Sequence, residues 1–394
     1  MSRLLSANYI FPVSSEPLKN GIIEIDDGGI ILNVIDTHGQ LKESANIEFY
    51  NGILVPGFVN AHCHLELSHL KDKFPKNTKL EGFIKNIFSL RHAEESEIIS
   101  SAVAADAELQ QNGVVAVGDI SNNHLTFNIK KNSSIFYHTF IEVFSPDSTK
   151  AEERINSGAL LLQQACDLQL SASLSPHAPY SMSVKLFNLL EDEMKKTTLP
   201  VSLHNQESDE ENKLYKYGQG KLYELFISMG FDMQSLCSGY NSLQSVSKFL
   251  PVLNNILLVH NTYTTEADIN EISKLFENLF FVLCPNSNLF IESHLPDIEM
   301  MYRKGLSIAI GTDSYSSNDT LSILDELKTI TRHFSTISLE TLIKWATLNG
   351  AKALDCDFMI GSIEKGKQPG INLLTGIDFE KMKITDYTCI RKIS

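Results

Sequence analysis

Two histidines one residue apart, His62 and His64, follow a strand-like apolar run at 53–59 and are the first residues that could do chemistry. Side chains two positions apart on an extended strand point the same way, so both imidazoles can reach one point at the strand's end. That geometry suits a divalent metal of the zinc type, which takes imidazole nitrogen at about 2.0–2.1 Å. A single pair of this kind is weak evidence, because most such histidines lie on a surface or in a core. The hypothesis therefore depends on ligands from distant parts of the chain.

Histidines and acids also stand at the ends of later strand-like segments. They are Asp119, His177, His204, His260 and Asp313. Each alone has an ordinary structural explanation: a histidine at a strand end is usually a hydrogen-bonded structural residue, and Asp313 could cap the next helix. Their joint placement favours a site, because a barrel of parallel strands brings these ends together.

The donor types favour an open catalytic centre over a closed structural one, which would favour cysteine. We predict that His62, His64, His204 and Asp313 bind one divalent ion and leave a position for water. Such an ion lowers the pKa of its water toward ~7. Asp313 could also accept the proton of that water.

Two further residues could complete the chemistry. His260 is placed to hydrogen-bond the water or a developing oxyanion, and Glu207 follows His204 by three residues. Glu207 could protonate a ring nitrogen and then pass the proton to a leaving amine. The alternative for Glu207 is a solvated loop acid, because three more acids follow it at 209–211.

The segments that must position these side chains alternate between strand and helix patterns. Apolar runs of strand length occur at 114–120, 135–144, 170–175, 201–204, 256–260, 279–284 and 306–313, and the run before His62 is the eighth. Helical patterns lie between most of them, at 82–91, 97–111, 184–196, 266–276 and 321–334. Apolar strands that alternate with helices indicate a parallel α/β sheet covered by helices. Eight such units fit a (β/α)8 TIM barrel. An open doubly wound sheet is the alternative, but it usually has a glycine-rich phosphate loop that this chain lacks.

The two ends of the chain have a different pattern. Residues 1–56 read as short strands separated by turns, and a strand-like segment at 371–374 follows a glycine-rich stretch, so the tail could rejoin the N-terminal strands. A helical run occupies 338–354. The long polar connection at 208–254 predicts extra helices over the barrel mouth.

Composition excludes several classes of partner. The net charge of −15 would repel nucleic acid and anionic membranes. The six cysteines are scattered without a CxxC pair, as is typical of reduced thiols. No segment has the pattern of a signal peptide or approaches the ~20 apolar residues of a membrane helix. We expect a cytoplasmic protein with a small-molecule substrate.

The segments PGFVNAHCHLE, HAPYS, SLHNQES, VHN, CPNSN and GTDSYSSN, in this order, resemble the amidohydrolase superfamily in its cytosine-deaminase and triazine-hydrolase-like branch. The resemblance covers essentially the whole chain. It implies a distorted barrel at 57–354 and a small β-sandwich formed by 1–56 and 355–394. It also implies a single metal, with zinc expected and iron as the alternative, because residues 175–177 replace the carboxylated lysine of two-metal members. The ligands and catalytic residues that it implies are those predicted above.

Within that branch, GDISNNH, HAPYS, HNQES and SSNDTLSILDEL are similar to the aminofutalosine deaminases of menaquinone synthesis. The resemblance implies a metal-dependent aminohydrolase of an aminopurine nucleoside, with 6-amino-6-deoxyfutalosine as the best single substrate. Guanine or methylthioadenosine deamination and chloride release by a chlorohydrolase are the alternative activities. A non-catalytic interaction protein is the alternative from another class, and a homodimer is left open.

A nucleoside-like substrate needs polar groups around the mouth of the site. We expect Glu66 to accept hydrogen bonds from ribose hydroxyls and His177 to meet a distal carboxylate. Ser121, Asn122 and His124, which follow the second strand, are further candidates on the same rim.

Overall fold

The computed structural model describes residues 2–40 and 46–394. Its centre is a set of eight strands: β6 (Phe58–Cys63), β7 (Val114–Ser121), β8 (Phe136–Val143), β9 (Ser171–Pro176), β10 (Val201–Asn205), β11 (Ile256–His260), β12 (Leu279–Leu283) and β13 (Ile308–Ile310). They form two parallel four-stranded sheets, β6-β7-β8-β9 and β10-β11-β12-β13. The strands β6, β10, β11 and β12 are buried along their whole length, as expected for a parallel sheet covered on both faces.

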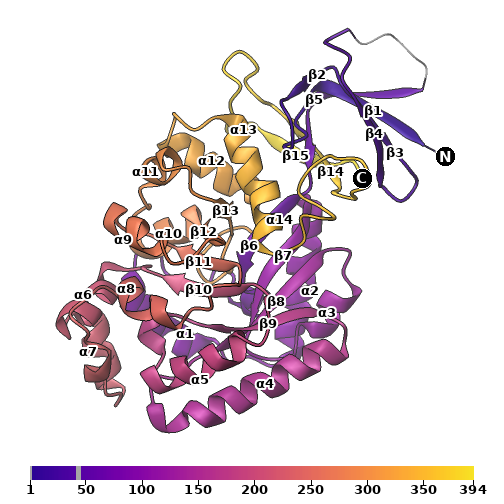
Figure 1. Ribbon diagram of the computed structural model, residues 1–394. Helices are drawn as coiled ribbons and strands as arrows, with labels where there is room; N and C mark the ends of the chain where they lie inside the picture. Colours follow the sequence, from indigo (N-terminus) through magenta and orange to yellow (C-terminus); the bar gives the residue numbers. More distant parts are fainter. Residues whose placement is uncertain (1, 41–45) are drawn as a thin grey trace.

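The two sheets meet at both edges and close a distorted barrel (Figure 1). On one side the amide of His204 donates to the carbonyl of His177 at 2.9 Å, which joins the ends of β9 and β10. On the other side Cys63 forms an isolated parallel bridge with Asp313, and the amide of Thr312 donates to the carbonyl of His62 at 3.1 Å. These irregular contacts replace regular ladders at the two seams. The prediction of a distorted (β/α)8 barrel is confirmed.

Helices surround the barrel: α1 (Lys79–Leu90), α2 (Glu95–Gln111), α3 (Phe127–Asn132), α4 (Ala151–Asp167), α5 (Val184–Met194), α9 (Glu266–Ile272), α10 (Pro285–Glu292), α11 (Ile298–Arg303), α12 (Ile323–His333), α13 (Leu339–Lys344) and α14 (Gly350–Ala353). The long connection after β10 contains α6 (Asp209–Tyr217), α7 (Lys221–Ser228) and α8 (Ser242–Val246), so the expected extra helices are present. A π-helical turn, Trp345–Asn349, joins α13 to α14 within the predicted run. In the described residues no helix is long and apolar enough to cross a membrane.

Both ends of the chain build one further sheet, beside the barrel in Figure 1. Its strands are β1 (Arg3–Ile10), β2 (Leu18–Lys19), β3 (Ile22–Ile25), β4 (Ile31–Ile35), β5 (Ile47–Pro56), β14 (Ile371–Thr375) and β15 (Cys389–Lys392). The order is β15-β14-β5-β1-β3-β4, with β2 paired to β1. The tail therefore rejoins the N-terminal strands. All seven strands are joined by hydrogen bonds into one continuous sheet, because β14 pairs directly with β5 and β5 with β1.

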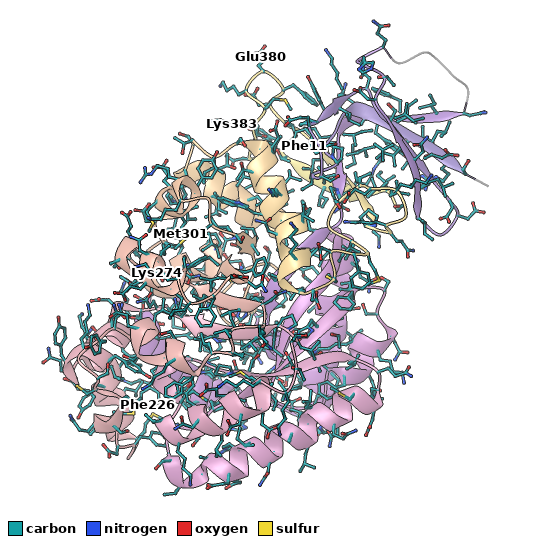
Figure 2. The ribbon with its side chains drawn as sticks, viewed as in Figure 1. Phe11, Phe226, Lys274, Met301, Glu380 and Lys383 are labelled. Atoms are coloured by element: carbon teal, nitrogen blue, oxygen red, sulfur yellow. The ribbon has the colours of Figure 1, made fainter. Side chains whose placement is uncertain are left out.

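A short junction connects this sheet to the barrel. Gly57 is the only residue between β5 and β6, and a Cβ there would collide with the Val115 side chain and the Pro369 carbonyl. Phe11, which is buried in the same apolar cluster as the barrel strands, fills the contact between the two parts (Figure 2). The first barrel strand, which carries His62, is thus held directly against the terminal sheet.

Candidate active site

Three histidines from two strands meet at the carboxyl end of the barrel. His62 lies in β6 and His64 directly after it, while His204 lies in β10. Nε2 of His64 is 3.2 Å from Nε2 of His62 and 3.3 Å from Nε2 of His204. Asp313, just after β13, directs Oδ1 to the same place, 3.5 Å from Nε2 of His64. The structure therefore brings all four predicted ligands together, and all four are buried.

Hydrogen bonding and burial favour neutral imidazole rings in this cluster, and a neutral ring can direct a lone pair at a metal. Nδ1 of His204 donates to the carbonyl oxygen of His177 at 2.8 Å, so a neutral His204 ring carries its lone pair on Nε2. Burial lowers the pKa of both His62 and His204, which keeps these rings neutral at pH 7. Converging neutral nitrogens cannot all hydrogen-bond one another, and a shared cation would satisfy them.

The fourth ligand is held by two serines. Oδ2 of Asp313 accepts hydrogen bonds from Ser287 Oγ at 2.7 Å and Ser317 Oγ at 2.6 Å, which leaves Oδ1 for the histidine side. Burial opposes the charge on Asp313, but the neighbouring histidines outweigh it and hold the pKa of this carboxyl below its ordinary value. Three imidazoles and a carboxylate are a donor set that fits zinc and iron, so the residues present fit the predicted metal.

An acid and a fifth histidine lie beside this cluster. Oε1 of Glu207 is 3.7 Å from Nε2 of His260. Glu207 is only 5% exposed, and burial raises its pKa well above the ordinary value, helped by the charges of Asp313 and Glu292. Nδ1 of His260 donates to Oδ1 of Asn288 at 3.0 Å, which fixes the proton on Nδ1 of a neutral ring. Glu207 is therefore a buried acid and not the solvated loop residue of the alternative interpretation.

The backbone contributes to this arrangement at two strand ends. His260 and Asp313 both have left-handed φ values, 71° and 59°. Non-glycine residues pay roughly 1–2 kcal/mol for this conformation, and such strain is often found at functional sites.

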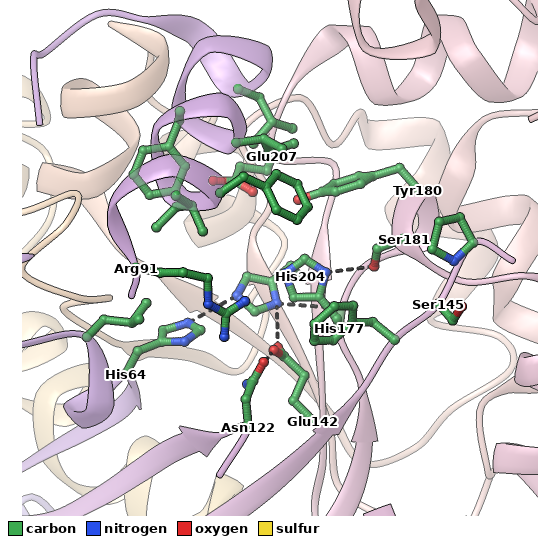
Figure 3. Close-up of a pocket in the computed structure, with 18 of the residues that line it drawn as sticks. His64, Arg91, Asn122, Glu142, Ser145, His177, Tyr180, Ser181, His204 and Glu207 are labelled. Carbon is green, nitrogen blue, oxygen red and sulfur yellow. Dashed lines mark hydrogen bonds and ion pairs between the residues drawn. The ribbon is translucent and has the colours of Figure 1, made fainter. Parts of the chain in front are cut away.

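The cluster opens into a cavity of about 300 Å³ (Figure 3). Of the predicted substrate-binding residues, Glu66, Asn122 and His177 line it. The backbone amide of Asn122 donates to Oε2 of Glu66 at 3.1 Å, and its side-chain Nδ2 donates to Oε2 of Glu142 at 3.0 Å. Burial raises the pKa of Glu66 to about 7.

His177 differs from the expectation in its chemistry. Ser181 donates its hydroxyl proton to the Ala178 carbonyl, so its Oγ accepts from Nδ1 of His177 at 2.7 Å. Burial lowers the pKa of His177 to about 4, so Nε2 of the neutral ring holds a lone pair. A lone pair would repel a carboxylate but can accept a hydroxyl proton.

Two of the three candidates at the end of the second strand, Ser121 and His124, do not reach the cavity. Ser121 is buried on the other side of β7, where its Oγ accepts from Lys130 Nζ at 2.7 Å. Lys130 also forms a fully buried ion pair with Asp119, 2.6 Å from its Oδ2. His124 is exposed and is not among the cavity residues. Successive strand residues face opposite sides, so Asn122 faces the cavity and Ser121 cannot.

The sequence reasoning missed several cavity and support residues. Ser287 and Asn288 lie in CPNSN after β12, so the same strand-end rule that identified the histidines could have found them. Glu142 is the next-to-last residue of β8, and no motif marks it. Arg91, which follows α1, had no signal of its own in the sequence.

Comparisons with known proteins show the family and the fold. An amidohydrolase family model matches residues 53–391. An adenosine deaminase of Helicobacter pylori is 29% identical over 338 residues, which is 82% of this chain and 79% of that protein. A crystal structure of Helicobacter pylori aminofutalosine deaminase with methylthio-coformycin superposes with a TM-score of 0.82 at 26% identity, covering 94% of this chain and 92% of that one. An atrazine chlorohydrolase from Arthrobacter aurescens has the same fold, with a TM-score of 0.75 at 15% identity over 99% and 92% of the two chains.

The family model covers well over half of the chain, and its match spans every strand that carries a site residue. The chain therefore belongs to the amidohydrolase family and is a hydrolytic enzyme that acts on C–N bonds.

Proposed function

We propose that the protein is a metal-dependent deaminase of a 6-aminopurine nucleoside, with 6-amino-6-deoxyfutalosine, converted to futalosine and ammonia, as the best candidate. The observation that carries the proposal is Glu207, a buried acid with a raised pKa that faces the same cavity as the histidine cluster. Expulsion of an amine needs a proton donor, and expulsion of chloride does not. This acid therefore favours deamination over the chlorohydrolase alternative.

One divalent ion, with zinc expected, would be held by His62, His64, His204 and Asp313. When bound, such an ion lowers the pKa of a water molecule toward ~7 and so supplies a nucleophile at neutral pH. Asp313 is ionised and would accept the proton that the water gives up.

Glu207 and His260 would act on the substrate itself. Glu207 would donate its proton to the ring nitrogen next to the carbon that bears the amino group, as water adds to that carbon. Nε2 of His260, which carries a lone pair, would accept a hydrogen bond from the hydroxyl that the carbon gains, because Nε2 lies on the cavity side beside Glu207. The proton that Asp313 took from the water then passes to the amino group, and the C–N bond breaks to release ammonia. The hydroxyl on the carbon gives its proton back to Glu207 as the purine carbonyl forms, while the proton on the ring nitrogen stays in the product.

Two cavity residues would hold the sugar, and a third would position them. Glu66 accepts hydrogen bonds from ribose hydroxyls, and Nε2 of His177 accepts another. Asn122 keeps Glu66 and Glu142 in place through its two hydrogen bonds. A free base would leave these buried polar groups unpaired, which lowers its affinity.

The relatives support a nucleoside substrate. The Helicobacter pylori relatives are an adenosine deaminase and an aminofutalosine deaminase, and a 5′-deoxyadenosine deaminase is 24% identical over 85% of this chain. The substrates in these names share a 6-aminopurine base and differ in the group attached to the sugar.

An ammonia-release assay tests the proposal. Zinc-loaded protein is given adenosine, 5′-deoxyadenosine, methylthioadenosine and aminodeoxyfutalosine, with guanine, cytosine and atrazine for comparison. We expect ammonia from the nucleosides, with the highest kcat/KM for aminodeoxyfutalosine, and one divalent ion per chain by elemental analysis. A preference for a free base over every nucleoside would overturn the substrate class. Chloride from atrazine without ammonia from any nucleoside would overturn deamination, and protein that retains no metal would favour a non-catalytic role.

A further inference from the structure

Glu207, the proposed general acid, lies in a short turn between a strand and a helix. β10 ends at Asn205 and α6 begins at Asp209, so the turn consists of residues 206–208. Gln206 has a left-handed φ of 45°, a conformation that costs a residue with a side chain free energy and that the surrounding contacts must maintain. This conformation sets the direction in which the next side chain, that of Glu207, leaves the backbone. The contacts that fix Gln206 therefore also fix the acid.

Glu211, in the first turn of α6, is one of these contacts. Its Oε1 accepts a hydrogen bond from the amide of Gln206 at 3.1 Å, and the amides of Gln206 and Glu207 both favour its ionised form. The carbonyl of Gln206 accepts a hydrogen bond from the amide of Tyr263, in the loop after β11, at 3.0 Å. Both polar backbone groups of Gln206 are thus held, one of them by a side chain.

Glu211 differs from the two acids that precede it. Asp209 and Glu210 pair with Lys213, and their side chains are 53% and 16% exposed. Glu211 is completely buried, and burial raises its pKa to about 8. It is not among the residues that line the cavity, so it is not placed to contact a substrate there. A buried acid is costly unless its oxygens have partners, which indicates a specific role inside the protein.

The ordinary role for an acid at this position is helix capping. Ser208 is the N-cap of α6 and Glu211 follows it by three residues, the spacing of a capping box, in which the acid accepts from the N-cap amide. α9 has that arrangement, with Oδ2 of Asp268 accepting from the amide of its N-cap Thr265 at 2.9 Å. An aspartate is therefore long enough to cap a helix in this protein. The longer Glu211 instead reaches Gln206, two residues before the N-cap.

We infer that Glu211 is a positioning residue, whose carboxyl fixes the turn at Gln206 and thereby holds Glu207 where it can transfer a proton to the substrate. The inference rests on the proposed function, because Glu211 acts on the reaction only through Glu207. A misplacement of a reacting group by about 1 Å can lower a rate by about 10²-fold, so a small movement of the turn is enough to matter.

Two substitutions of Glu211 separate positioning from capping. Glu211→Gln keeps the length and an acceptor oxygen, so kcat for ammonia release should stay within about 3-fold of wild type. Glu211→Asp keeps an acid that can cap α6 but withdraws the acceptor from Gln206, so kcat should fall by about 10–100-fold while KM and zinc content stay within about 2-fold. Glu210→Asp is the matched control, the same change one residue away, and should keep kcat within about 2-fold.

Combination with Glu207→Gln shows whether Glu211 acts through Glu207. If it does, adding Glu211→Asp to the Glu207→Gln protein should lower the remaining kcat by less than about 3-fold, because no acid is left to position. The same factor in both backgrounds would indicate a merely structural role, and a loss of zinc would indicate an effect on His204. Either result would overturn the inference, as would wild-type kcat in Glu211→Asp or an equally large loss in Glu211→Gln.

Amide hydrogen exchange provides a measurement that needs no turnover. In zinc-loaded protein, segment 205–208 should exchange at least about 10-fold faster in Glu211→Asp than in the wild type, and at nearly the wild-type rate in Glu211→Gln. If no nucleoside is deaminated but this exchange pattern appears, the proposed function fails and the role of Glu211 in fixing the turn stands. If nucleosides are deaminated and neither exchange nor kcat depends on Glu211, the proposed function stands and the inference fails.

Discussion

Replacement of Glu207 by glutamine separates the chemistry of this residue from its packing. The side chain is buried, and its Oε1 lies 3.7 Å from Nε2 of His260. Glutamine has the same shape, so the fold and the metal ligands should be undisturbed. The variant loses the carboxyl group, which can donate and accept a proton, whereas the amide of glutamine cannot.

The expected loss follows from the state of this acid. Burial raises the pKa of Glu207 well above its ordinary value, which favours the protonated form that a general acid needs. Positioned acid–base catalysis contributes about 10²–10⁴-fold, which corresponds to about 3–5 kcal/mol of transition-state stabilisation. We expect kcat for the best nucleoside to fall by that factor.

The assay is steady-state ammonia release by zinc-loaded protein, with the metal content of each variant measured in parallel. Asp209→Asn is the matched control, because Asp209 is an acid two residues away that is about half exposed and pairs with Lys213 at 2.9 Å. The control should keep its rate within about 2-fold of wild type, as surface substitutions usually do. Full turnover by the Glu207 variant, or a loss of metal that accounts for its lower rate, would refute the proton-transfer role.

Three further predictions concern the metal, the core and pH. His204→Ala should lose both bound zinc and activity by elemental analysis and ammonia assay, and activity that survives in metal-free protein would contradict the ligand set. Asp119→Asn leaves the buried charge of Lys130 uncompensated and should lower the free energy of unfolding by about 3–5 kcal/mol in urea melts. The double variant with Lys130→Met should recover much of this loss, and no recovery would show that Asp119 matters for another reason. Burial lowers the pKa of His138 from 6.5 to about 3. Between these two pH values, His138 is protonated in the unfolded chain but neutral in the folded chain. Stability from this group is complete above pH 6.5 and falls by up to about 1.4 kcal/mol per pH unit from there toward pH 3, and urea melts of His138→Gln should show a correspondingly smaller slope.

The sequence was sufficient for the residues whose positions follow from strand periodicity. His62 and His64 share a face because side chains on a strand repeat every two residues. His204, His260 and Asp313 could be grouped with them because parallel strands in a barrel end at one face. The barrel itself followed from the alternation of apolar runs with helices, and the tail was expected to rejoin the N-terminal strands.

Tertiary structure alone decided which neighbours of those residues face the cavity. Ser121 and Asn122 are adjacent and equally polar, and only the register of β7 against β6 and β8 turns one inward and the other toward Lys130. α1 has an apolar stripe with the period of a helix packed on a core, but the stripe lies over the cavity. Arg91 is isolated in the sequence, and only the fold places it in the lining of the cavity, where its charge acts on Glu66 and Glu142. Local spacing fixes which side chains share a face, whereas the space and the partners that a face meets depend on segments far away in the chain.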